Sequence, residues 1–141
     1  RVIDSVKAHI ERGGKTIAEC GGMMYLASEL VMCKDPYTAF KMVDALPMKV
    51  SACKDDMRLA MGYRSFDFRG VKLRGHEFHY SDSNNNGHDF LALKASGISE
   101  WSCSHANKVL YAGYPHIHLW GNINFARNFI RACDEFAKKR D

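Results

Sequence analysis

The sequence predicts an α/β layered domain in which a mixed sheet is flanked by helices. Two observations predict this class. Amphipathic helical patterns open and close the chain, and apolar runs of strand length, separated by Gly and Asn turns, lie between them. The chain has 141 residues, the size of one domain. We therefore expect a single domain over residues 1–141, with an antiparallel extension formed by the central strands.

The first elements follow from local patterns. Apolar residues at helical spacing, followed by Gly13, predict a helix over residues 2–12. The run 16–19 is too short for a helix and predicts a strand. A tight turn at 20–22 then leads into a second helix, to which the apolar residues between 23 and 30 belong.

The pattern in the centre of the chain predicts strands, and the pattern at its end predicts a helix. The predicted strands cover residues 48–54, 58–68, 72–81, 90–94 and 109–119. Residues 84–87, Asn-Asn-Asn-Gly, form the clearest loop. The final helix is predicted over 123–139, with a buried apolar stripe formed by Ile123, Phe125, Ala126, Phe129, Ile130, Cys133 and Phe136.

Composition excludes several classes of protein. The net charge of +4 is mild, and no segment interleaves basic and aromatic residues, so we expect no nucleic-acid partner. No apolar run approaches the roughly 20 residues that a membrane span needs. The five cysteines are an odd number without CxxC spacing, which argues against a disulfide framework and a zinc knuckle. We expect a reducing, cytoplasmic setting.

Cys20 is the candidate nucleophile. A thiol on a sharp strand-to-helix turn needs small residues beside it, and Ala18 and Gly22 supply them. This turn projects the sulfur outward at a helix N-terminus, where the helix dipole favours the thiolate. The alternative is a small buried residue after a strand.

Two histidines are candidate partners of this thiol. His116 and His118 are two apart on a predicted strand end, so both are expected on one face. His116 would accept the thiol proton and return it to a leaving amine, while His118 would fix the tautomer of His116. A metal pair and plain structural histidines remain as alternatives.

The segment 74–81, Arg-Gly-His-Glu-Phe-His-Tyr-Ser, is dense in polar side chains for a strand. Alternation places His76 and Phe78 on one face and Glu77 and His79 on the other, so the segment cannot bind one metal as a set. We expect a polar pocket wall, with Glu77 accepting from a cationic ammonium group. An edge strand with scattered histidines is the alternative.

Four motifs occur in one order and together carry a resemblance. They are residues 18–26 (Ala-Glu-Cys-Gly-Gly-Met-Met-Tyr-Leu), 61–64 (Met-Gly-Tyr-Arg), 74–81, and 113–118 (Gly-Tyr-Pro-His-Ile-His). From about residue 2 to its end, the chain resembles the C-terminal glutaminase domain of the cobyrinic acid a,c-diamide synthases. The resemblance implies a class I glutamine amidotransferase-like fold of the cobyrinate and cobyric acid synthase branch.

The resemblance also implies roles for single residues. Cys20 matches the nucleophile and His116 the histidine that activates it. His118 stands where the wider class I group has a carboxylate, which leaves the third catalytic member open. The resemblance implies that Gly21 and Gly22 bind the substrate through their backbone. It also implies that Glu77 and His79 lie at the glutamine pocket or at a domain interface.

The resemblance further implies partners outside these residues. Relatives carry, upstream, a strand with a Gly-rich oxyanion loop and an ATP-binding synthetase domain, and no Gly-x-x-x-x-Gly-Lys-Ser/Thr motif occurs here. We expect a domain truncated at its N-terminus that binds glutamine and no cofactor or metal of its own. ATP and magnesium would belong to the synthetase domain, which would also hold the corrin substrate.

Several alternatives stay open at this point. They are a cobyric acid synthase-type or cell-wall amidating glutaminase, a catalytically silent binding module, and a metal-binding domain using His116 and His118. Apolar surface left bare by the absent strand would favour a homo-oligomer.

Overall fold

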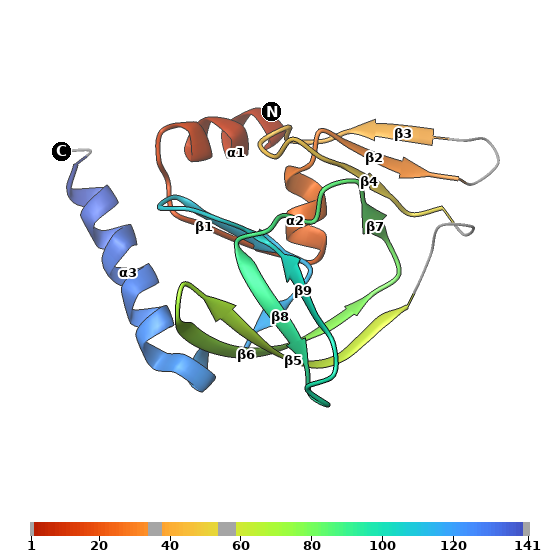
Figure 1. Ribbon diagram of the computed structural model, residues 1–141. Helices are drawn as coiled ribbons and strands as arrows, with labels where there is room; N and C mark the ends of the chain where they lie inside the picture. The colour runs from red at the N-terminus through yellow and green to blue at the C-terminus, as the bar shows by residue number, and fades with distance from the viewer. Residues whose placement is uncertain (1, 34–37, 54–58, 140–141) are drawn as a thin grey trace.

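Two parallel strands form the centre of the fold. The structure is a computed structural model that describes residues 2–33, 38–53 and 59–139 (Figure 1). Strand β1 (Thr16–Glu19) pairs in parallel with β11 (Leu110–Gly113), and β10 (His105–Ala106) continues the sheet antiparallel to β11. All four residues of β11 are buried, as is typical of a strand covered on both faces.

Two helices flank β1 along the chain. Helix α1 (Val2–Glu11) precedes this strand, and α2 (Gly21–Leu26) follows it after a single residue, Cys20. Met23 and Leu26 of α2 are buried in a core that also contains Met48 and Val50. The apolar face of α1 packs against the same core with partly buried side chains. This packing fixes the helix that begins directly after Cys20.

A four-stranded sheet lies beside α2, at the right of Figure 1. Its strand order is β3 (Thr38–Lys41), β2 (Glu29–Met32), β4 (Lys49–Ser51) and β7 (Asp82–Ser83). β2 and β4 are parallel, and the other pairs are antiparallel.

A five-stranded antiparallel sheet forms the lower part of the molecule in Figure 1. Its order is β12 (His116–Ile117), β6 (Val71–His79), β5 (Ala60–Phe68), β8 (Phe90–Lys94) and β9 (Glu100–Cys103). Its inner face buries Phe66, Leu73 and Phe90. Gly75 lets β12 approach β6, because a Cβ atom there would overlap the carbonyl oxygen of His116. The expected antiparallel extension and the mixed sheet are confirmed.

Most predicted elements are confirmed, with differences at their ends. The second helix ends at Leu26, where Ala27 turns to an extended backbone (φ −60, ψ 168), and Leu30 lies in β2. The strand predicted over 109–119 is divided into β11 and β12, because Pro115 has no N–H to continue the ladder.

Other differences concern short elements. Leu119 begins a 3-10 helix, η1 (Leu119–Asn122), instead of ending a strand. The strands β2, β3, β7, β9 and β10 were not predicted. Each spans two to four residues, too few for a clear alternation of apolar and polar side chains. The predicted strand ends at 54 and 58 lie outside the described residues.

The final helix is confirmed as α3 (Ile123–Lys138), but the prediction of a buried stripe is wrong. None of its residues is buried, and Ile130 is 66% exposed. Its first turn contacts the sheet through Phe125, whose ring centroid lies 6.4 Å from that of Tyr111. A cavity of about 500 Å³, lined by residues of α3 and of β1, β10 and β11, lies between this helix and the sheet. The helix therefore half-buries its apolar face.

The cysteines also differ from expectation. Cys33 and Cys53, which follow β2 and β4, form a disulfide. Their strands are neighbours in one sheet, a pairing that the spacing of the cysteines in the sequence does not reveal. Cys20, Cys103 and Cys133 are free thiols.

Candidate active site

Cys20 lies on a strained turn between β1 and α2. Its backbone has φ 49 and ψ −108, a positive φ that is uncommon for a residue other than Gly. The Cys20 N–H donates to the carbonyl of Gly113 (2.8 Å), and its carbonyl accepts from the N–H of Met24 (3.0 Å). The predicted turn is confirmed, and the thiol at its tip is partly exposed.

Two glycines follow the thiol in the first turn of α2. Gly21 and Gly22 are both exposed. The N–H groups of a first helical turn have no acceptor within the helix, so these two amides are available to an outside oxygen. A Cβ at Gly22 would lie 3.6 Å from the Cβ of Ala18, an ordinary van der Waals contact.

His116 reaches the same end of the central sheet from the other strand. Glu19 and Gly113 are paired as the last residues of the parallel strands β1 and β11, and β12 begins three residues after Gly113, at His116. The imidazole is half-buried, and its Nδ1 atom lies 3.5 Å from Oε2 of Glu19. The other carboxylate oxygen, Oε1, accepts from the N–H of Ile117 (2.8 Å).

A second histidine covers the ring of His116. His76 is opposite His116 in the pairing of β6 with β12, and the two rings stack at 4.9 Å with 10° between their planes. Sequence reasoning assigned neither Glu19 nor His76 a role beside His116. The available signal was the position of Glu19 directly before Cys20, a charged residue ending a strand of the central sheet.

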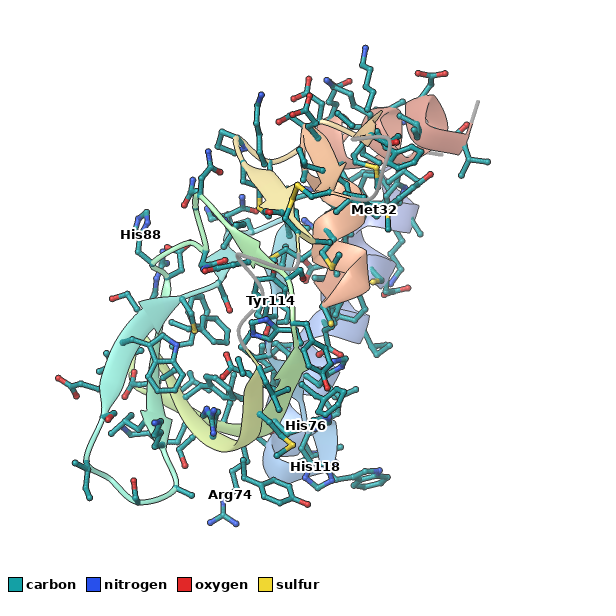
Figure 2. All side chains as sticks on the ribbon, turned by 90° about the vertical axis from the view of Figure 1, so that its right-hand side faces the viewer. Met32, Arg74, His76, His88, Tyr114 and His118 are labelled. Atoms are coloured by element: carbon teal, nitrogen blue, oxygen red, sulfur yellow. A yellow bond between two sulfur atoms is a disulfide. The ribbon has the colours of Figure 1, made fainter. Side chains whose placement is uncertain are left out.

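His118 lies elsewhere. It is exposed at the start of η1, and its backbone N–H donates to the carbonyl of Arg74 (2.8 Å). Figure 2 labels His118, Arg74 and His76 at one end of the molecule. Among the described residues, no hydrogen bond, ion pair or ring contact joins the His118 side chain to His116. Because β12 ends at Ile117, the strand alternation expected for His116 and His118 does not extend to His118.

Tyr114 lies beside the Cys20 turn, near the centre of Figure 2. Its hydroxyl shares a hydrogen bond with Oγ of Ser81 (3.1 Å), and its ring stacks on His79 at 3.7 Å. Burial raises the pKa of Tyr114 to about 12, the hydrogen bond shared with Ser81 opposes this change, and the nearby Asp82 and Cys20 add to it. Tyr114 therefore stays neutral beside the thiol.

Glu77 and His79 line a cavity of about 430 Å³ together with Arg64, Cys103 and Tyr114. The predicted alternation is confirmed, since Glu77 is buried whereas His76 and Phe78 are exposed. The cation beside Glu77 belongs to the chain itself: Nε of Arg64 donates to Glu77 Oε2 at 3.0 Å, with both side chains less than 10% exposed. The sequence did not indicate this pairing across β5 and β6.

The described residues contain neither a cluster of three potential metal ligands nor a helix that could span a membrane. Within residues 2–33, 38–53 and 59–139, no three His, Cys, Asp or Glu side chains gather as a metal site. No helix in the part of the chain that the structure describes is long and apolar enough to cross a membrane.

Together, the fold and this site define an α/β domain with a thiol on a strained strand-to-helix turn and a histidine shortly after the end of the neighbouring strand. Cysteine and histidine are the residue types that serve as nucleophile and base in enzymes that attack an amide or ester carbonyl with cysteine. The chain belongs to the CobB/CobQ-like glutamine amidotransferase domain family, whose profile matches residues 1–123.

Curated relatives extend the comparison. The chain is 32% identical to the cobyrinate a,c-diamide synthase of Priestia megaterium, over 99% of this chain and 31% of that protein. It is 33% identical to the same-named protein of Fusobacterium nucleatum (88% and 28%) and 35% identical to that of Sulfurisphaera tokodaii (81% and 27%). The chain thus spans less than a third of the length of these relatives.

Proposed function

We propose that this domain hydrolyses the side-chain amide of glutamine and releases ammonia. The observation that carries the proposal is the Cys20 thiol on its strained turn, next to the first-turn amides of Gly21 and Gly22, which have no acceptor within the helix. His116, which opens β12 shortly after the end of the adjacent strand β11, supplies a base. Membership of the amidotransferase family supports glutamine as the substrate.

The chemistry assigns a step to each group. The Cys20 sulfur attacks the amide carbon of glutamine while His116 takes the thiol proton, and the carbonyl oxygen becomes an oxyanion that accepts from the N–H groups of Gly21 and Gly22. The carbon–nitrogen bond then breaks as His116 returns the proton to the leaving nitrogen, which departs as ammonia. A glutamyl thioester remains on Cys20. Water, deprotonated by His116, cleaves it to glutamate and restores the thiol.

We place the glutamine beside Tyr114, with Glu77 and His79 in the wall of its pocket. Tyr114, which lies beside the Cys20 turn, is one of the residues that line this cavity, whereas Cys20 and His116 are not. A carboxylate offers about four acceptor positions, so the bond from Arg64 leaves Glu77 able to accept from the α-ammonium group of a substrate.

The names of the relatives suggest where the ammonia goes. We propose that it amidates the a and c carboxylates of cobyrinic acid, with ATP and magnesium bound by another domain of the same polypeptide, which also holds most of the corrin. Amidation of a carboxylate needs activation, and ATP supplies it as an acyl phosphate. A cytoplasmic location stays a prediction. The Cys33–Cys53 disulfide counts against the expectation of a reducing environment.

Covalent labelling tests the glutaminase proposal. The protein is treated with a glutamine-analogue diazoketone or with iodoacetamide, and adducts are counted by intact mass. We expect one diazoketone adduct, absent in Cys20→Ser and retained in Cys133→Ser, the matched control that removes the partly exposed thiol of α3. Equal labelling of Cys20→Ser and wild type by the diazoketone would contradict the proposal, as would labelling of Cys20 by iodoacetamide alone in the full-length protein.

A further inference from the structure

Glu19 joins the nucleophile turn to the histidine. It is the last residue of β1 and directly precedes Cys20. Its two carboxylate oxygens contact successive residues of β12: Oε1 accepts from the Ile117 N–H at 2.8 Å, and Oε2 lies 3.5 Å from Nδ1 of His116. One side chain thus contacts both the backbone and the ring at the end of β12.

A histidine that serves as a base requires a defined tautomer. In a neutral imidazole one nitrogen carries the proton and the other accepts, and the partner of the first nitrogen decides which is which. A carboxylate beside Nδ1 fixes the proton there and leaves Nε2 free to accept. Among the described residues, Glu19 is the carboxylate paired with the His116 ring, whereas no hydrogen bond, ion pair or ring contact joins the His118 side chain to it.

We propose that Glu19 is the positioning residue for His116, keeping the proton on Nδ1 and stabilising the ring when it becomes an imidazolium. The inference rests on the glutaminase function proposed above, in which His116 is a catalytic residue. Glu19 acts through His116 and touches no substrate.

The location of Glu19 in the chain also couples the position of His116 to that of Cys20. Glu19 and Cys20 are consecutive, so the side chain that orients the base is anchored on the same backbone as the nucleophile. Its bond to Ile117 fixes β12 relative to β1 across 98 residues of sequence. A displacement of β12 relative to the thiol would therefore have to break this bond.

The competing explanation is that Glu19 only holds β12 in place through the Ile117 bond. Glu19→Gln separates the two roles, because the amide oxygen still accepts from the Ile117 N–H. The amide NH₂ group would then face His116 Nδ1 and donate to it, which favours the opposite tautomer, with the proton on Nε2. Glu19→Asp keeps the charge on a shorter side chain.

The test measures glutamate release by the full-length protein for the wild type, Glu19→Gln, Glu19→Asp and a matched control, Glu29→Gln. Glu29 pairs with Lys49 in another sheet (3.3 Å). We expect Glu19→Gln to lose about 100-fold in kcat, the lower end of general acid–base contributions, with KM and melting temperature nearly unchanged. We expect Glu19→Asp to recover at least about tenfold of this loss. Nitrogen-15 NMR should find the His116 proton on Nδ1 in the wild type and on Nε2 in Glu19→Gln.

Other results of this experiment would overturn either the positioning role of Glu19 or the proposed glutaminase function. Full activity of Glu19→Gln, or an unchanged tautomer, overturns the positioning role while the glutaminase proposal stands. Equal losses in Gln and Asp with a lowered melting temperature would leave Glu19 a purely structural residue and also overturn it. A wild type that neither releases glutamate nor reacts with the diazoketone overturns the proposed function, and this inference with it.

Discussion

The ring of His76 stacks on the ring of His116 at a centroid distance of 4.9 Å, with 10° between the two planes. The two residues are directly paired across β6 and β12. Glu19 lies beside the Nδ1 edge of the His116 ring. A further contact on the face of the ring is therefore needed to keep the imidazole from tilting. His76 supplies this contact.

His76→Ala should therefore lower glutaminase activity. Without the stacked ring, His116 can tilt away from its working orientation, and misplacement of a catalytic group is costly. We expect a loss of about tenfold in kcat. Steady-state kinetics of glutamate release measures it.

His76→Phe is the matched control, since a flat ring restores the stack without a titratable group. It should retain most of the activity. If His76→Phe were as impaired as His76→Ala, the imidazole itself would be required and the stacking explanation would be wrong.

The Arg64–Glu77 pair supports the wall of the 430 Å³ cavity. Arg64 also donates to the carbonyls of Met61 (3.1 Å) and Tyr63 (3.0 Å). Removing the cation leaves a buried carboxylate without its partner. We expect Arg64→Met to lower the free energy of unfolding by about 3–5 kcal/mol, measured by urea denaturation.

The double variant Arg64→Met/Glu77→Gln provides the control, because it removes both charges. It should regain at least half of the lost stability, since a neutral amide costs less to bury than an unpaired carboxylate. Equal stability of the single and double variants would show that the unpaired charge is not the cause.

The parts of the site that sequence predicted are those encoded locally. The turn at Cys20 follows from small residues on either side of one thiol, and the separation of His76 from Glu77 follows from strand alternation. The contact of Glu19 with His116 could not be predicted in this way. It depends on the parallel pairing of β1 with β11 and on the position of β12, which no local pattern specifies.

The same limit explains the errors. The spacing of apolar residues predicted the helix α3, but spacing does not tell how much partner surface the helix finds, and its face is only half-buried. His118 was expected on the face of His116, but the strand ends at Ile117. Cys33 and Cys53 are brought together by the pairing of β2 with β4.

Cys103 makes stability sensitive to alkaline pH. The residue is 5% exposed, and burial raises the pKa of its thiol from 9.0 to about 11, with nearby Glu77 adding to the change and Ser104 opposing it. The thiolate is therefore disfavoured in the folded state, and between these pH values the unfolded chain releases the proton more readily. The stabilisation is complete below about pH 9 and is lost as the pH rises toward 11.

Comparison of the wild type with Cys103→Ala isolates this group, because other titrations cancel in the difference. We expect the stability advantage of the wild type to shrink by about 1 kcal/mol between pH 8 and pH 10, as urea denaturation at each pH would measure. The raised pKa of buried Tyr114 also makes stability fall as the pH rises, but this effect starts only above the ordinary pKa of tyrosine, 10.0. A constant difference for Cys103→Ala would mean that this thiol ionises as easily in the folded as in the unfolded protein.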